Sequence, residues 1–133
     1  MDNLQIGVLS CSGEECLGGT LARMATRMVM EENPDKVVTL CLPLYIAGGE
    51  EERSFARDYP VISVDGCSEY CAKRATIKFS GKVQDTLNIT DIIDEDTALG
   101  KPVSMRDLTE EHYGMAEQIA EEIGKKVNFI VKK

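Results

Sequence analysis

The sequence lacks the features of nucleic-acid-binding, membrane-spanning and secreted proteins. Basic residues are few, with 15 Lys and Arg against 23 Asp and Glu, and the formal net charge of −8 argues against binding a phosphate backbone. The longest apolar stretch, residues 37–49, contains Pro43 and is too short to cross a bilayer. The apolar segment at residues 4–9 is too short for the hydrophobic region of a signal peptide, and no basic segment precedes it. We expect a cytoplasmic protein without nucleic-acid or membrane partners; the acidic surface favours a basic protein or small-molecule partner, and the oligomeric state is not indicated.

Several common site motifs are also missing. His112 is the single histidine and stands beside two glutamates, which is typical of an exposed helix start. The acidic residues 91–96 do not have the spacing of an EF-hand loop. No arginine follows Cys11 in the next turn, where a phosphatase loop would need its guanidinium. Calcium-sensor and phosphatase chemistry are therefore disfavoured.

Cysteine is the unusual component of an otherwise ordinary composition. The chain has 133 residues, 43% of them hydrophobic, which is enough for one domain with a hydrophobic core over residues 1–133. There are five cysteines, an odd number without a dense pairing pattern. This pattern favours reduced thiols over a disulfide framework.

Apolar runs and helical stripes alternate along the chain. Strands are predicted at residues 6–9, 37–42, 61–64 and 86–90, with a further edge strand at 127–131. Helices are predicted after an N-cap at Thr20, within 47–59, from Cys67 to about Phe79, and from Asp107 or Thr109 to Gly124, with an acidic linker at 91–99. The alternation predicts a three-layer α/β fold, Rossmann-like, with a mostly parallel sheet and helices on both faces.

The most informative stretch runs from residue 61 to residue 74. Val61 to Val64 form a short β-branched run that leads directly into Asp65, Gly66 and Cys67. If a helix begins at Cys67, then Cys67 and Cys71 lie one turn apart on the same helical face. A strand, a tight turn and two thiols at a helix start form a suitable frame for a metal or redox site.

These residues resemble a known family. Asp65-Gly66-Cys67 followed by Cys71-Ala72-Lys73 is similar to the signature of the DGC-domain family of small zinc-binding proteins. Cys11-Ser12-Gly13, Cys41-Leu42 and the segment at residues 88–90 match the same family in order and spacing. The resemblance covers about residues 6–93 and leaves the last forty or so residues, including 94–133, unmatched. It implies a zinc-binding module but no particular reaction.

The predicted topology places thiols together. Cys11, Cys41 and Cys67 each lie at or just beyond the carboxyl end of a predicted strand. The carboxyl ends of parallel strands share one edge, where ligands bind at the topological switch point. With Cys71 they provide four thiolates, the preferred donors for tetrahedral zinc. The fifth thiol, Cys16, is compatible with a replacement ligand, a resolving thiol or no role. Asp65 is compatible with orienting a ligand or with accepting the turn amides of Cys67 and Ser68.

Three functions remain open at the sequence level. The first is a functional zinc or thiolate site for metal handling, metal sensing or group transfer. The second is a thiol redox enzyme or sensor that uses Cys11 with Cys16, or Cys67 with Cys71, although three or four intervening residues differ from thioredoxin-type spacing. The third is a binding module for a partner enzyme with a structural zinc. A small anion-binding loop formed by Ser10, Ser12, Gly13 and the amides around Gly18 and Gly19 is also compatible with the sequence.

Overall fold

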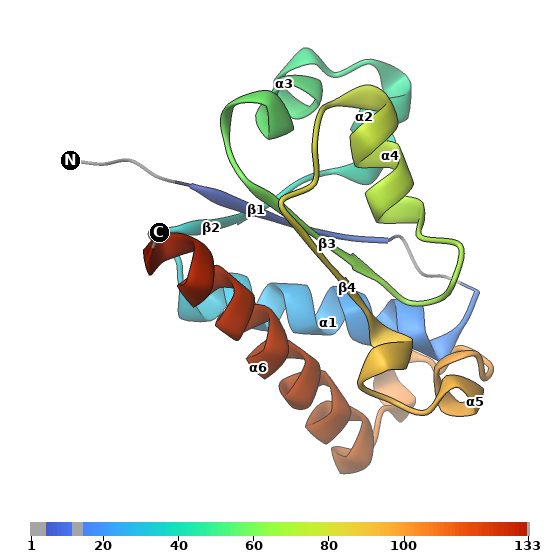
Figure 1. The fold of residues 1–133 in the computed structure, drawn as a ribbon. Coiled ribbons are helices and arrows are strands. Elements are labelled where there is room, and N and C mark those ends of the chain that lie inside the picture. Colours follow the sequence, from blue (N-terminus) through green and yellow to red (C-terminus); the bar gives the residue numbers. More distant parts are fainter. Residues whose placement is uncertain (1–4, 12–14, 133) are drawn as a thin grey trace.

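The computed structural model describes residues 5–11 and 15–132 and shows an α/β fold with three layers (Figure 1). Among these residues, one four-stranded sheet forms, and each neighbouring pair of strands is parallel. The strands are β1 (Ile6–Ser10), β2 (Val37–Thr39), β3 (Val61–Asp65) and β4 (Asp85–Asn88). The predicted fold class, with a parallel sheet between layers of helices, is confirmed.

The strand order places a topological switch point at the centre of the sheet. The order is β2-β1-β3-β4, with Ile6 opposite Val37 and Val8 opposite Ile62. The chain therefore passes from β1 to β2 on one side and then returns across β1 to place β3 on the other side. In open parallel sheets a ligand crevice lies beyond the carboxyl ends of the two strands where the order reverses. Here those strands are β1 and β3.

Helices cover both faces of the sheet. In Figure 1, α1 and α6 lie together against one face, whereas α2, α3 and α4 lie on the other. The helices are α1 (Leu17–Glu32), α2 (Leu42–Ala47), α3 (Glu50–Asp58), α4 (Cys71–Phe79), α5 (Glu95–Ala98) and α6 (Glu110–Lys132), with short 3-10 turns η1 (Ile89–Asp91) and η2 (Met105–Asp107). Within residues 5–11 and 15–132, none of these helices has the length and apolar character needed to span a bilayer.

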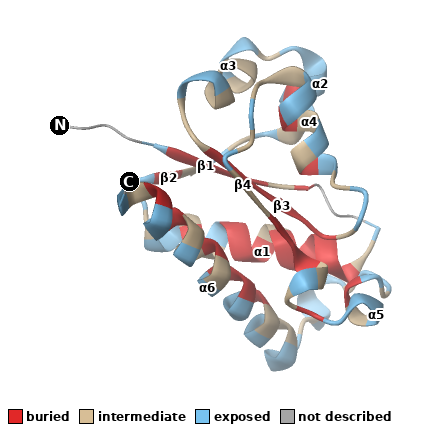
Figure 2. Ribbon diagram, viewed as in Figure 1, coloured by how far each residue is buried: buried red, intermediate tan, exposed pale blue. Residues whose placement is uncertain are grey.

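The core lies between the sheet and the helix pair α1 and α6 and continues through the buried central strands (Figure 2). All five residues of β3 are buried, as expected for a parallel strand covered on both faces. Leu21 and Ala25 of α1 and Ile119 and Ile123 of α6 are completely buried. Each large aliphatic side chain of this kind contributes about 1.5–3 kcal/mol of burial free energy. The fold therefore has a substantial core apart from the cysteine-bearing edge.

The two long helices differ from their predicted bounds because of tertiary contacts. α1 begins at Leu17 with Cys16 at the N-cap, and Thr20, the predicted cap, is buried inside the helix. α6 continues through Gly124, so the predicted edge strand at residues 127–131 is wrong. Val127 and Ile130 are buried with Ile123 at spacings of three and four, which lie on one side of a helix.

The segments around the second strand and after the fourth strand also differ from prediction. β2 ends at Thr39, and Leu42–Ala47 form α2 with Pro43 in its first turn, where the missing amide costs nothing. α3 lies within the predicted range 47–59 and begins at Glu50, with three glutamates in its first turn. Residues 91–99, predicted as a linker, include the four-residue helix α5, capped by Asp94.

Candidate functional site

The carboxyl ends of β1 and β3 bring together the residues that the sequence singles out. Cys11 follows β1, and its amide donates to the carbonyl of Val64 in β3 over 3.0 Å. Asp65 is the last residue of β3, and Gly66 and Cys67 follow it directly. Cys71 is the first residue of α4. These groups therefore lie at the switch point rather than elsewhere on the sheet edge.

Cys11 is the buried thiol of this group, with 8% of its surface exposed. The amide of Gly66 donates to its Sγ atom over 3.4 Å, which connects the ends of the two central strands. Burial raises the pKa of the Cys11 thiol to about 11; the charges of Asp65, Cys71 and Cys67 add to the rise, and the Gly66 amide opposes it. Cys67 directly follows Gly66 in the chain, so this hydrogen bond also places the Cys67 segment beside Cys11.

Asp65 holds the start of α4. Its carboxylate is 1% exposed and accepts hydrogen bonds from the amide of Ala72 over 2.7 Å and from that of Lys73 over 3.2 Å. Burial raises the pKa of Asp65, whereas these two amides and the Lys73 charge oppose the rise. The carboxylate thus accepts helix amides rather than the turn amides of Cys67 and Ser68 that the sequence suggested. Its position fixes Cys71, which directly precedes Ala72.

Cys67 and Cys71 do not share a helical face, so that prediction is wrong. Cys67 lies in a bend before α4. Tyr70, between this bend and the helix, has left-handed backbone angles (φ 52°), so Cys67 is not part of α4. Cys71 is nevertheless near both Cys67 and Asp65. Burial raises the pKa of the Cys71 thiol, the charges of Asp65 and Cys67 raise it further, and the Arg74 charge lowers it.

Asn88 is a site residue that the sequence reasoning did not single out. It ends β4, is 2% exposed, and its Nδ2 atom donates to the carbonyl of Cys67 over 2.8 Å. Its Oδ1 atom accepts from the amide and hydroxyl of Thr90 over 3.0 and 2.7 Å. The side chain therefore joins the cysteine loop to η1. Its place in the segment 88–90, which resembles the family, was the available signal.

Close backbone packing fixes the same loop from the side of α1. A Cβ atom placed on Gly66 would lie 2.5 Å from the Gly19 nitrogen, and one on Gly18 would lie 2.4 Å from the Gly66 oxygen. Both distances are too short for real carbon contacts, so only glycine permits this approach. The first turn of α1 therefore packs directly on the loop between Asp65 and Cys67.

Cys41 and Cys16 occupy different surroundings. Cys41 is exposed at the N-cap of α2, and its amide donates to Glu52 Oε2 over 2.7 Å. Cys16 is half-buried at the N-cap of α1 and its side chain makes no capping hydrogen bond. Neither thiol is among the groups that shift the pKa of Cys11 or Cys71. The interactions described by the structure thus link three of the five thiols.

The cysteine side chains are suitable zinc donors, but the structure of the described residues does not place them at zinc-binding distances. Thiolates are preferred zinc ligands. The charges of Cys67 and Cys71 act on Cys11, and the charge of Cys67 acts on Cys71. Across residues 5–11 and 15–132, however, no three His, Cys, Asp or Glu side chains are arranged to hold a metal ion. The residues therefore supply the right donor type, and metal binding would require their side chains to move closer together.

The remaining sequence candidates lie apart from this group. His112 is half-buried, and its Nδ1 atom accepts the Thr109 amide over 3.0 Å at the start of α6. The anion-loop residues Ser12 and Gly13 lie outside the described residues. The hydrogen bonds that His112 makes within the described residues are with Thr109 and not with the cysteines.

Comparison with known proteins identifies the family. The family model described as DGC domain matches residues 7–123, which is most of the chain. The match extends about thirty residues beyond the part that the sequence motifs suggested and includes much of α6. No curated protein matches the chain, and no solved structure does so either. The chain belongs to the DGC domain family.

Proposed function

We propose that this member of the DGC domain family binds one zinc ion through cysteine thiolates at the switch point of its sheet. The proposed ligands are Cys11, Cys67 and Cys71, with Cys41 as the fourth. The observation that carries this proposal is the way hydrogen bonds join the three cysteine segments beyond the ends of β1 and β3. The amide of Gly66, next to Cys67, donates to Cys11 Sγ, and Asp65 accepts the amide of Ala72, next to Cys71. Zinc supplies a positive charge that stabilises neighbouring thiolates, which otherwise repel one another.

The surrounding residues support such a site. Four thiolates around one zinc ion carry a net charge of −2, which needs a positive environment. The start of α4 provides it, because the Lys73 and Arg74 side chains act on Asp65 and Cys71. Asp65 and Asn88 hold the two ends of the segment that carries Cys67 and Cys71. These residues act as positioning groups, whereas the thiols act as donors.

The location favours a functional role over a fold-supporting one. Cys67 and Cys71 follow the carboxyl ends of the central strands, where parallel sheets bind ligands, and the buried Cys11 borders the apolar core at the same edge. A zinc ion there would serve metal handling, metal sensing or transfer of a group to a thiolate. A domain with this many buried aliphatic residues does not need a metal ion to fold.

The decisive experiment is elemental analysis of protein purified without chelator, together with single cysteine variants. We expect about one zinc per chain in the unmodified protein. Cys11→Ser, Cys67→Ser and Cys71→Ser should each lose most of the zinc, and Cys16→Ser is the matched control that should keep it. Cys41→Ser tests the fourth ligand separately.

The same preparation distinguishes zinc binding from redox function. Metal-free protein with five reactive thiols would contradict the zinc site. A disulfide among Cys11, Cys67 and Cys71 in that preparation would instead support a thiol redox function. Loss of zinc in Cys16→Ser but not in Cys41→Ser would replace the proposed fourth ligand with Cys16.

A further inference from the structure

The outer face of α4 has a charge opposite to that of the rest of the chain. Residues 70–84 contain four cationic side chains and no Asp or Glu, whereas the other residues contain eleven cations and 23 acidic groups. The four cations are Lys73, Arg74, Lys78 and Lys82. A local positive surface on a strongly acidic protein attracts negatively charged partners to that place.

This face also exposes a large apolar side chain. Ala72 and Thr76 are buried against the rest of the molecule, so α4 presents Cys71, Arg74 and Lys78 outward at spacings of three and four. Ile77 lies beside them with 56% of its surface exposed. Ile77 lines two shallow hollows. One also contains Arg74 and Lys78, and the other contains Lys73, Lys82 and Asp85, whose carboxylate pairs with Lys126 over 3.2 Å.

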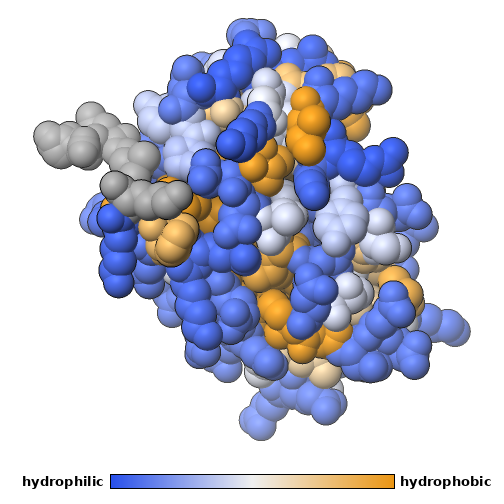
Figure 3. All heavy atoms as spheres, viewed as in Figure 1, coloured by the Kyte–Doolittle hydropathy of each residue, from blue (hydrophilic) through white to orange (hydrophobic). Residues whose placement is uncertain are grey.

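The neighbouring helix extends the apolar character of this layer. Leu44 and Ile46 of α2 are 41% and 69% exposed, and α2 packs against α4. Figure 3 shows hydrophobic side chains at the surface in the region of α2 and α4, surrounded by hydrophilic ones. Apolar side chains within a charged rim are typical of protein interaction sites.

The cations of this face are weakly engaged within the chain. Arg74 pairs with Glu69 over 3.6 Å, but both side chains are more than 70% exposed, so the pair contributes little. Lys73 and Lys78 lie over the rings of Tyr70 and Phe79. Lys82 has no ion-pair partner among the described residues. Lys78 and Lys82 are therefore the charges most available to a partner, and Arg74, which also donates to the Glu69 carbonyl over 3.2 Å, can exchange these exposed contacts for a partner's carboxylate.

We propose that the outer face of α4 docks an acidic protein segment that carries an apolar side chain among its carboxylates. The apolar residue would cover Ile77, and the carboxylates would pair with Arg74, Lys78 and Lys82. The segment would then lie directly beside the exposed thiol of Cys71. This inference goes beyond the zinc proposal, because the docking needs no metal ion.

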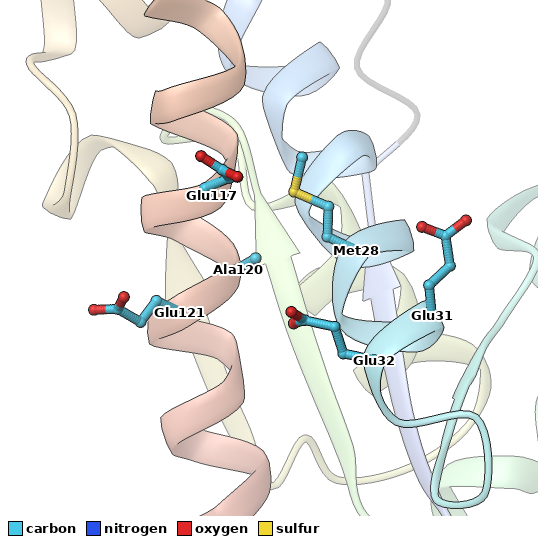
Figure 4. Close-up of a pocket in the computed structure, with 6 residues that line it drawn as sticks. All are labelled: Met28, Glu31, Glu32, Glu117, Ala120 and Glu121. Carbon is cyan, nitrogen blue, oxygen red and sulfur yellow. The ribbon is translucent and has the colours of Figure 1, made fainter.

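Other occupants fit this surface less well. Nucleic acid is disfavoured because four cations on a chain of charge −8 offer few phosphate contacts. For a second copy, the described residues offer an acidic hollow between α1 and α6, bordered by Met28, Glu31, Glu32, Glu117, Ala120 and Glu121 (Figure 4). That hollow lies in the opposite helix layer, so two copies would meet through two different surfaces, whereas most homodimers pair the same surface on both copies.

The test uses the full chain and a labelled peptide probe. The probe is a helical peptide with two leucines in one stripe and glutamates on both sides of it, and its control has glutamine in place of each glutamate. Binding is followed by fluorescence anisotropy at low and moderate salt. We expect the acidic peptide to bind at least about tenfold more tightly than its glutamine version, with the difference reduced by salt.

Charge-reversal variants show where the peptide binds. Lys78→Glu with Lys82→Glu should weaken binding at least about tenfold, and Ile77→Ser should also weaken it. The matched control reverses two exposed lysines elsewhere, Lys36→Glu with Lys101→Glu, and should change the affinity less than about twofold. Circular dichroism confirms that each variant is folded.

Three outcomes would overturn the proposal. The first is no binding of the acidic peptide up to about 1 mM. The second is an equal loss in both double variants, which would indicate only a general charge effect. The third is salt-sensitive self-association of the protein in sedimentation that is lost both in Lys78→Glu with Lys82→Glu and in Glu117→Lys with Glu121→Lys, which would make a second copy the occupant.

Discussion

Replacing Gly66 with alanine tests the packing that holds the cysteine loop. The added Cβ atom would lie 2.5 Å from the Gly19 nitrogen, 2.6 Å from the Gly18 carbonyl carbon and 2.8 Å from the Gly19 Cα atom. All three atoms belong to the backbone at the start of α1, so no flexible side chain can move aside. The loop and the helix must separate, and the hydrogen bond from the Gly66 amide to Cys11 Sγ lengthens or breaks.

The expected cost can be given as an order of magnitude. Overpacking of this kind typically destabilises a protein by about 1–3 kcal/mol. With a urea dependence of about 2 kcal/mol per molar, the unfolding midpoint should fall by about 0.5–1.5 M. Under the zinc proposal, the variant should also hold less zinc after dialysis, because Cys11 and Cys67 no longer keep their relative positions.

Gly114→Ala and Gly124→Ala are the matched controls. Both glycines lie in α6, and a Cβ atom on either meets no described atom within 4 Å apart from its chain neighbours and the backbone of its own helix. Since alanine favours a helix interior over glycine, each control should gain up to about 1 kcal/mol in the free energy of unfolding. If Gly66→Ala unfolds at the same urea concentration as the unmodified protein, the described contact between the loop and α1 is wrong.

Three further predictions concern the loop, the thiols and the core. Asn88→Asp keeps the acceptor for Thr90 but removes the donor to the Cys67 carbonyl, so the free energy of unfolding should fall by about 1–3 kcal/mol in urea titrations. In metal-free protein, iodoacetamide should label exposed Cys41 well before Cys11, whose burial raises its pKa to about 11; mass spectrometry that finds Cys11 labelled first would contradict this order. Ile119→Ala should cost about 2–5 kcal/mol in the same titrations, and a loss below 1 kcal/mol would mean that α6 is not packed as described.

The sequence predicts the central strands well because burial on both faces leaves a clear pattern. β1 and β3 are apolar runs in which nearly each side chain is buried, and runs of that kind have few alternatives. The end of α6 shows the opposite case. Val127 and Ile130 are β-branched residues near a glycine, which favours a strand locally, but packing of α6 against α1 keeps the segment helical.

The site is predictable in its residues and less so in its geometry. Cysteines after successive strands indicate a shared edge, and the hydrogen bonds of Gly66 and Asp65 connect the segments that carry Cys11, Cys67 and Cys71. The start of α4 depends on contacts that no local pattern contains. Asp65 accepts amides seven and eight residues later in the chain, and Tyr70 has a left-handed backbone. Cys67 consequently lies outside the helix that its spacing from Cys71 suggested.

Removing the proposed zinc separates a functional site from a structural one. Structural zinc contributes on the order of 10 kcal/mol in small fingers that have almost no core. Here Ile6, Leu21, Val61 and Ile119 are completely buried away from the cysteine loop, and apolar burial contributes roughly 25 cal/mol per Å². Chelation should therefore leave the far-UV circular dichroism nearly unchanged. Amide hydrogen exchange should quicken at residues 65–71 and little elsewhere, because these residues connect the proposed ligands. A cooperative loss of helical signal on chelation would show that the metal supports the whole fold, and the proposal of a functional site would then fail.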